Sequence, residues 1–187
     1  MKSIRMVLTV LTVLMSLVAL SSVAASAAEF TISVPAFKKI ENKQVFKGFG
    51  CEGGNISPEV SWENAPEGTK SFALTVYDPD APTGSGWWHW VAYNIPATTK
   101  LIVEGAGTAD GKKLPKGTAQ GTTDFGTKGY GGPCPPAGDK PHHYIVTLTA
   151  LKTAKIEVPA TATAAMIGFN IGANALGKAT MTGTYGR

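Results

Sequence analysis

The stretch Ser71-Phe-Ala-Leu-Thr-Val-Tyr77 decides the fold class, because it carries the clearest strand pattern in the chain. Large apolar residues alternate in it with Ala and Thr, and a period of two is typical of a β-strand with two different faces. Further along the chain, the run from His143 to Leu151 is rich in β-branched residues and predicts a second strand. We therefore expect a fold built mainly from β-structure.

Weaker patterns predict strands over Trp90–Ile95 and Thr31–Val34, and Ala179–Tyr185 is predicted as the last strand, a candidate for a sheet edge. The segment Thr163–Leu176 has a helical pattern, with Gly177 as its stop. Its apolar stripe comprises Met166, Phe169, Ala173 and Leu176. Many short strands, Gly and Pro punctuation and few helices predict an antiparallel β-sandwich.

Residues 1–28 are predicted to be a signal peptide. Lys2 and Arg5 give a positive start, an apolar uncharged stretch follows, and small residues close the segment. Cleavage after Ala27 and cleavage after Ala28 both fit, and the choice stays open. The apolar stretch is shorter than the roughly 20 residues of a spanning helix, and an uncleaved N-terminal anchor is the alternative. No cysteine stands at the cleavage site, so a lipid anchor is not expected. We expect a periplasmic or secreted protein.

Residues 29–187 have the length of one domain with a sizeable core. The whole chain has 17 basic and 13 acidic residues, and removal of Lys2 and Arg5 leaves 15 against 13. Arg187 is then the one arginine of the mature chain. Because bidentate recognition of phosphates and bases relies on arginine, we expect no nucleic-acid partner.

Cys51 and Cys134 are the two cysteines of the chain. Export would place them in an oxidising compartment, where a disulfide persists. We therefore hypothesise a bridge between them, and the alternative is a pair of separate buried thiols.

Four groups of residues attract attention as a candidate site: Asp78–Pro82, Trp87–Trp90, Gly129–Pro136 and Pro141–Tyr144. Each lies at a predicted strand end or in a loop. Taken alone, the first is a common Asp-Pro turn, and His89 in the second is more often a packed core histidine. Their joint occurrence is more informative than any one of them.

A strand period of two puts His142 and Tyr144 on one face and turns His143 to the other. Adjacent histidines therefore do not share one small site, and a metal would need three or four converging ligands. We expect no metal and no cofactor. The chain has no Gly-x-Ser-x-Gly elbow, and bridged cysteines are not nucleophiles, so we expect no catalytic residue and no enzyme.

In order and spacing, these groups resemble the signatures of the phosphatidylethanolamine-binding proteins, also called Raf kinase inhibitor proteins. Asp78-Pro-Asp-Ala-Pro82 followed by His89 is similar to the first signature, and Gly129–Pro136 followed by His142-x-Tyr144 to the second. The segment Phe49–Pro58 with Trp62 resembles the bacterial branch, and Met166–Asn170 resembles its late helix. The resemblance covers essentially all of residues 29–187.

The resemblance implies two antiparallel sheets with Greek-key connections, few short helices and a small pocket for phosphate, acetate or a phosphoethanolamine head group. The ligand-binding residues it implies are Asp78, His89, His142 and Tyr144, with Trp87 and Pro136 at the rim and main-chain amides beside Cys134. Because imidazole titrates near pH 6.5, we expect anion binding to strengthen as the pH falls towards about 6.

The first functional hypothesis is an exported binding protein that takes a phosphorylated ligand or a partner protein, without catalysis and without a stable membrane anchor after cleavage. An alternative is a protease or kinase inhibitor that acts through surface loops. A third is a hydrolase that uses His89 or His142 with Asp78 as an acid–base pair.

Overall fold

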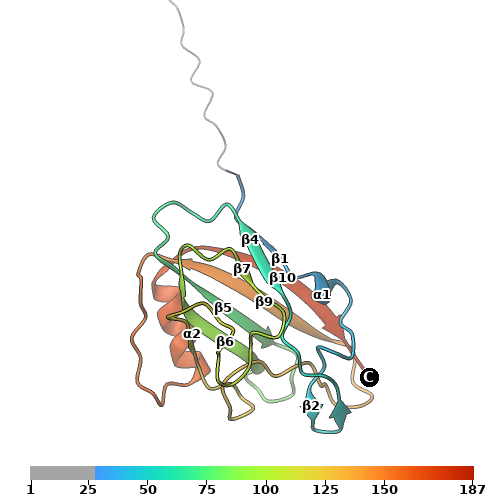
Figure 1. Cartoon of the computed structure of the whole chain (residues 1–187). Helices are drawn as coiled ribbons and strands as arrows, with labels where there is room; N and C mark the ends of the chain where they lie inside the picture. Colours follow the sequence, from blue (N-terminus) through green and yellow to red (C-terminus); the bar gives the residue numbers. More distant parts are fainter. Residues whose placement is uncertain (1–27) are drawn as a thin grey trace, which may run out of the picture.

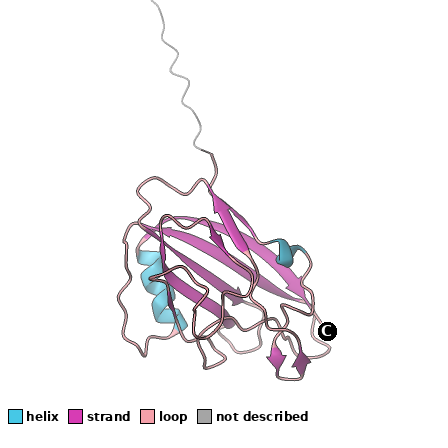
Figure 2. Cartoon of the chain, viewed as in Figure 1, coloured by secondary structure: helices cyan, strands magenta, loops and turns pink. Residues whose placement is uncertain are grey.

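The computed structural model describes residues 28–187, which fold around two antiparallel sheets (Figures 1 and 2). One sheet has three strands in the order β1 (Thr31–Ser33), β4 (Val60–Glu63) and β7 (Leu101–Ile102). The other has five, in the order β10 (Ala175–Tyr185), β9 (His142–Leu151), β5 (Ser71–Asp78), β6 (Trp87–Pro96) and β8 (Ala119–Gln120). A hairpin of β2 (Lys47–Gly48) and β3 (Cys51–Glu52) and two helices, α1 (Pro35–Lys38) and α2 (Ala164–Ala173), complete the domain. The predicted fold class is confirmed.

The central strand β5 explains the two-sided core. Phe72 and Leu74 are fully buried on one face, where they pack in the core between the two sheets. Ala73 points to the other face, where it packs with Ile167 and Ile171 of α2 in a second cluster. The alternation read from the sequence therefore separates two buried faces, and the smaller side chain leaves room for the helix.

The helix α2 begins one residue after Thr163, whose hydroxyl accepts a hydrogen bond from the Met166 backbone N–H. Three residues of the predicted apolar stripe, Met166, Phe169 and Ala173, are exposed on its outer face, where Phe169 is 77% exposed. The helix ends at Ala173, so the fourth, Leu176, lies in β10 instead. The buried face instead comprises Ala164, Ile167 and Ile171. Two apolar stripes with helical spacing occur in one short helix, so the spacing alone did not identify the inner one. Gly177 does not end the helix, since it lies within β10.

The predicted edge strand is present and longer than expected. β10 pairs with β9 on one side and forms the end of its sheet. The register aligns Tyr185 with His142 and Gly183 with Tyr144. The C-terminal end of β10 therefore lies beside the start of β9, which carries two of the predicted site residues.

The irregular segment from 103 to 141 runs across the molecule and holds, within the described chain, one short strand, β8. Its second half approaches the segment that leads into the β2–β3 hairpin so closely that a Cβ atom on Gly132 would lie 2.0 Å from the Gln44 carbonyl oxygen. A disulfide between Cys51 of β3 and Cys134 attaches the same loop to the hairpin itself. The predicted bridge is confirmed.

Residues 1–27 of the predicted signal peptide lie outside the described residues. Within residues 28–187, no helix has both the length and the apolar character needed to cross a bilayer.

We expect loss of the Cys51–Cys134 bridge to lower the free energy of unfolding. It closes a loop over a sequence separation of 83 residues, and removal of such a bridge typically costs about 2–5 kcal/mol. Urea unfolding of the oxidised protein and of the double Cys→Ser variant measures the difference. Thiol titration of the denatured, unreduced protein is the control, and two reactive thiols would contradict the bridge.

Candidate functional site

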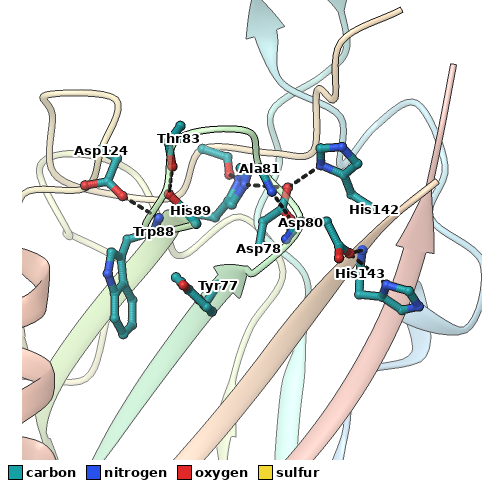
Figure 3. Close-up of polar contacts among 12 residues, drawn as sticks. Tyr77, Asp78, Asp80, Ala81, Thr83, Trp88, His89, Asp124, His142 and His143 are labelled. Carbon is teal, nitrogen blue, oxygen red and sulfur yellow. Dashed lines mark hydrogen bonds and ion pairs between the residues drawn. The ribbon is translucent and has the colours of Figure 1, made fainter. Parts of the chain in front are cut away.

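A pocket of about 160 Å³ opens where the ends of β5, β6 and β9 meet the loops. All seven residues predicted from the sequence line it: Asp78, Trp87, His89, Cys134, Pro136, His142 and Tyr144. Six further lining residues were not predicted as ligand-binding residues: Phe49, Ala81, Pro82, Thr83, Phe125 and Pro135. Ala81, Pro82 and Pro135 nevertheless belong to the motif groups singled out in the sequence. Figure 3 shows the polar contacts that hold this region together.

Asp78 is the last residue of β5 and is buried, with 3% of the residue exposed. Its Oδ1 accepts hydrogen bonds from the backbone N–H groups of Asp80 (2.8 Å) and Ala81 (3.1 Å), which is a common way for Asp to shape a turn. Its Oδ2 lies 2.8 Å from Nδ1 of His142. Figure 3 shows Asp78 and His142 pointing towards one another from neighbouring strands. The carboxylate is therefore fixed from both sides as a hydrogen-bond acceptor.

His142 and His143 start β9 and point to opposite faces, as the strand period predicts. His142 is buried, and its Nε2 lies 3.6 Å from a carboxylate oxygen of Asp139. The side chain of His143 is 56% exposed and pairs with Asp80, whose carboxylate also accepts from the His143 backbone N–H. That backbone hydrogen bond is the main cause that lowers the pKa of Asp80. His143 therefore stabilises the turn and stands outside the pocket.

His89 lies on β6 and is 3% exposed. Its Nδ1 is 2.7 Å from the Gly131 carbonyl oxygen, and a carbonyl only accepts, so the proton of the neutral ring is assigned to Nδ1. Nε2 then carries a lone pair and lies 4.0 Å from Oδ2 of Asp78. Burial lowers the pKa of His89 to about 4. The expectation of a titration near 6.5 was therefore wrong for this histidine, because the buried ring is separated from water.

Tyr144 lies on β9, two residues after His142, and is fully buried. Its hydroxyl has no hydrogen-bond partner among residues 28–187. Burial raises the pKa of Tyr144 far above its ordinary value, with the Asp78 charge as a further cause. Tyr130, also buried, differs because its hydroxyl donates to the Gln44 carbonyl oxygen at 3.1 Å. The Tyr144 hydroxyl is therefore a neutral donor that lies close to the Asp78 carboxylate without a hydrogen bond of ordinary geometry.

Aromatic rings form the mouth of the pocket. Phe125 packs 5.4 Å from Trp87 and 5.9 Å from Phe49, measured between ring centroids. Phe49 is 69% exposed and has a positive φ of 51°. These rim positions were missed because loops bring them together. The signal available was the segment Phe49–Pro58, which the family resemblance already includes.

Arg187 fastens this rim from the end of the chain. Its Nε donates to the Pro135 carbonyl oxygen at 2.7 Å, and its Nη1 donates to that of Gly50 at 2.9 Å. A weaker contact reaches the carbonyl of Phe49 at 3.3 Å. The guanidinium is therefore directed at backbone carbonyls, and it holds two loops of the pocket wall rather than lining the pocket itself.

The chemistry available at the pocket follows from these contacts. The lining side chains include one donor without a hydrogen bond of ordinary geometry, the buried Tyr144 hydroxyl near Asp78, and two acceptors, His89 Nε2 and the Asp78 carboxylate. Neither lysine nor arginine is among its described lining residues, and its single cysteine is bridged. The Thr83 hydroxyl donates to the Gly86 carbonyl. Within residues 28–187 no group of three or more His, Cys, Asp or Glu side chains is arranged to hold a metal ion.

We expect His89 to make the folded protein sensitive to acid between about pH 6.5 and about pH 4. In this range the unfolded chain binds a proton at His89 that the folded chain does not, so stability is present above pH 6.5 and is lost as the pH falls. The full loss from this group is about 3 kcal/mol. Urea unfolding from pH 7 to pH 4 should show a steeper fall for the wild type than for His89→Gln. Parallel profiles for the two proteins would contradict the assignment.

Comparison with known proteins places this geometry in a family context. A family model described as phosphatidylethanolamine-binding protein matches residues 37–186. The crystal structure of Escherichia coli YbcL, described as a member of the mammalian PEBP family, matches with a TM-score of 0.82 at 53% identity, covering 86% of this chain and 99% of that one.

Individual proteins are also similar to this chain in sequence. The chain is 53% identical to E. coli YbcL over 165 residues, which cover 87% of this chain and 90% of YbcL. It is 47% identical to E. coli YbhB over 147 residues, covering 79% and 92% of the two chains. A Mycobacterium tuberculosis protein that carries a lipoprotein name, LppC, is 34% identical over 162 residues, covering 87% and 75%.

Proposed function

The chain belongs to the phosphatidylethanolamine-binding protein family, and we propose that it is an exported binding protein whose pocket takes a small anion or a phosphate head group. It acts by binding a phosphorylated ligand or a partner protein, and it catalyses no reaction. The family membership supports the binding-protein fold. The ligand class is argued from the pocket of this chain.

One observation carries the proposal: Tyr144, whose buried hydroxyl makes no hydrogen bond of ordinary geometry within residues 28–187, lines the same small pocket as Asp78 and His89. A buried polar group without a partner costs about 1–3 kcal/mol. A ligand oxygen at this place would remove that cost. The pocket volume of about 160 Å³ lies below the roughly 300–1,000 Å³ of pockets for drug-sized ligands, so it suits a small group such as phosphate or acetate.

The same contacts favour binding over hydrolysis. Nδ1 of His142 is engaged by Asp78, and its Nε2 faces Asp139. The pKa of His89, about 4 because of burial, makes its imidazole a weak base at neutral pH, whereas an effective general base has a pKa near the working pH. The hydrolase alternative therefore has little support. Inhibition of a protease or kinase through surface loops stays a prediction.

Export is part of the proposal, and two observations support it. The disulfide between Cys51 and Cys134 is of a kind that persists in oxidising compartments. A relative at 34% identity carries a lipoprotein name. The pattern of residues 1–28 adds the sequence argument.

We expect the exported protein to begin at Ala28 or Glu29. Expression of the full chain in a bacterial host, followed by N-terminal sequencing of the protein in the periplasm or medium, tests this. An intact N-terminus, or protein confined to the cytoplasm, would contradict the signal peptide.

We expect Tyr144→Phe to weaken binding of inorganic phosphate and phosphoethanolamine by roughly tenfold to a hundredfold, since a hydrogen bond to a charged group contributes about 1.5–3 kcal/mol. The folded protein should not lose stability, because the hydroxyl has no partner within the described chain. NMR titration near pH 6 gives the affinities, and urea unfolding gives the stability.

Tyr130→Phe is the matched control, because its hydroxyl bonds the Gln44 carbonyl away from the pocket. It should lower stability by about 1 kcal/mol and leave binding unchanged. In the wild type, ring signals of His89 and His142 should shift with ligand while those of His143 stay. If no ligand moves these signals, the anion pocket is refuted.

A further inference from the structure

A second cleft lies between the loop segments 54–57, 104–109 and 127–131, and it shares no lining residue with the pocket that contains Asp78. Its volume is about 690 Å³, compared with about 160 Å³ for that pocket. Clefts that bind organic ligands typically have volumes of about 300–1,000 Å³. The second cleft is therefore large enough for an organic molecule with a body of several carbon atoms.

Hydrogen bonds between the three loop segments fix the shape of this cleft. Ser57 accepts from the Gly105 backbone N–H through its carbonyl oxygen at 2.9 Å, and from the Gly107 N–H through its hydroxyl at 2.8 Å. The Gly107 carbonyl in turn accepts from the Tyr130 N–H at 2.8 Å. The side-chain amide of Asn55 donates to the Tyr130 carbonyl at 3.1 Å. The cleft therefore exists before a ligand enters, which lowers the entropic cost of binding.

Two lysines give the second cleft an uncompensated positive charge. Lys113 and Lys128 line it from different loops, and both are exposed. Neither forms an ion pair with an acidic side chain within residues 28–187. Glu104, the one acidic residue among the described lining residues, is instead paired with Lys43 at 2.8 Å. A single unpaired lysine is usually just solvated, whereas a preformed cleft with two of them attracts anions.

Apolar surface lies directly beside this charge. A Cβ atom on Gly105 would lie 3.7 Å from Cγ2 of Ile56 and 4.0 Å from Nζ of Lys113, so the two side chains adjoin the same place in the cleft. Ile56 is 38% exposed. Phe46, a half-buried lining residue, is supported from behind by Phe125, with 4.3 Å between the ring centroids. An ammonium group beside hydrocarbon suits a ligand that combines a negative head with an apolar body.

We propose that the second cleft binds an organic anion with an apolar body, of which a medium-chain carboxylate is the simplest example. The carboxylate is attracted by Lys113 and Lys128, and the hydrocarbon part lies on Ile56 and Phe46. A lysine ammonium acts as a point charge and does not require the planar, bidentate geometry of an arginine pair. The inference goes beyond the proposed function, because it concerns a different site and does not depend on the pocket that contains Asp78.

Four small probes test the head group and the body separately on the wild-type protein: hexanoate, acetate, hexan-1-ol and hexylamine. NMR titration near neutral pH follows the backbone amide signals of Ile56, Gly105 and Lys128. Hexanoate should shift these signals saturably. Acetate lacks the apolar body and should bind at least about tenfold more weakly. Hexan-1-ol lacks the charge and should also bind about tenfold more weakly, and protonated hexylamine should bind more weakly still.

The variant with both Lys113→Gln and Lys128→Gln tests the charge directly, because it keeps side chains of similar length. Hexanoate should bind to it about tenfold more weakly, while the affinity for hexan-1-ol stays as in the wild type. Lys116→Gln is the matched control, since Lys116 is exposed in the same loop as Lys113 but does not line the cleft. Unchanged hexanoate binding in the double variant, or equal binding of hexanoate and hexan-1-ol by the wild type, would overturn the proposal.

Separate NMR signals distinguish this cleft from the pocket that contains Asp78. Hexanoate also carries a carboxylate, so the ring signals of His89 and His142 report whether it enters that pocket. The double lysine variant should reduce the response of Ile56 and Gly105 and leave any response of the two histidines unchanged. Shifts confined to the histidine signals, or no saturable binding of hexanoate at millimolar concentrations, would overturn the second site and leave the proposed function standing.

Discussion

Asp78, the last residue of the central strand β5, connects the turn after that strand to the start of β9 through one carboxylate. Oδ1 closes the turn through two backbone N–H groups, and Oδ2 meets His142. Removal of such a buried carboxylate would leave these donors unpaired, which is costly in a low-dielectric interior. The position of His142, and through the turn that of the rim residues Ala81 and Pro82, follows from this interaction.

The opposite wall of the pocket depends on different interactions. Gly131 is held twice by His89, since its N–H donates to the His89 carbonyl and its own carbonyl accepts from the ring. The disulfide at Cys134 and the guanidinium of Arg187 then attach the following residues to the β2–β3 hairpin. One wall is therefore an Asp-centred turn between strands, and the other is a loop fixed by covalent and charge-assisted bonds. The pocket forms where the two meet.

The strands and site residues that could be predicted are those whose sequence pattern lies within a few neighbouring residues. The eight residues of β5 and the ten of β9 have clear patterns, whereas β2, β3, β7 and β8 have two residues each and are too short to show a period. The seven site residues came from motif resemblance, because their positions relative to strand ends are encoded in nearby residues. Phe125 reaches the pocket through contacts with residues distant in the sequence, which no local pattern records, and Phe49 was noticed only as part of the segment that resembles the family. The outer and inner faces of α2 were not distinguished because both are apolar.

The protonation state of His89 marks a different limit of sequence reasoning. A histidine predicted to line an anion pocket is expected to be protonated and to attract the anion. The ordinary imidazole pKa of about 6.5 supports that expectation. The structure surrounds His89 with the rings of Tyr144 and Phe125 and gives its Nδ1 proton to Gly131. Desolvation then outweighs the favourable charge of Asp78, because the pKa falls to about 4 in spite of it. Neither lysine nor arginine is among the described lining residues, so an anion in this pocket would depend on neutral donors more than on fixed positive charge.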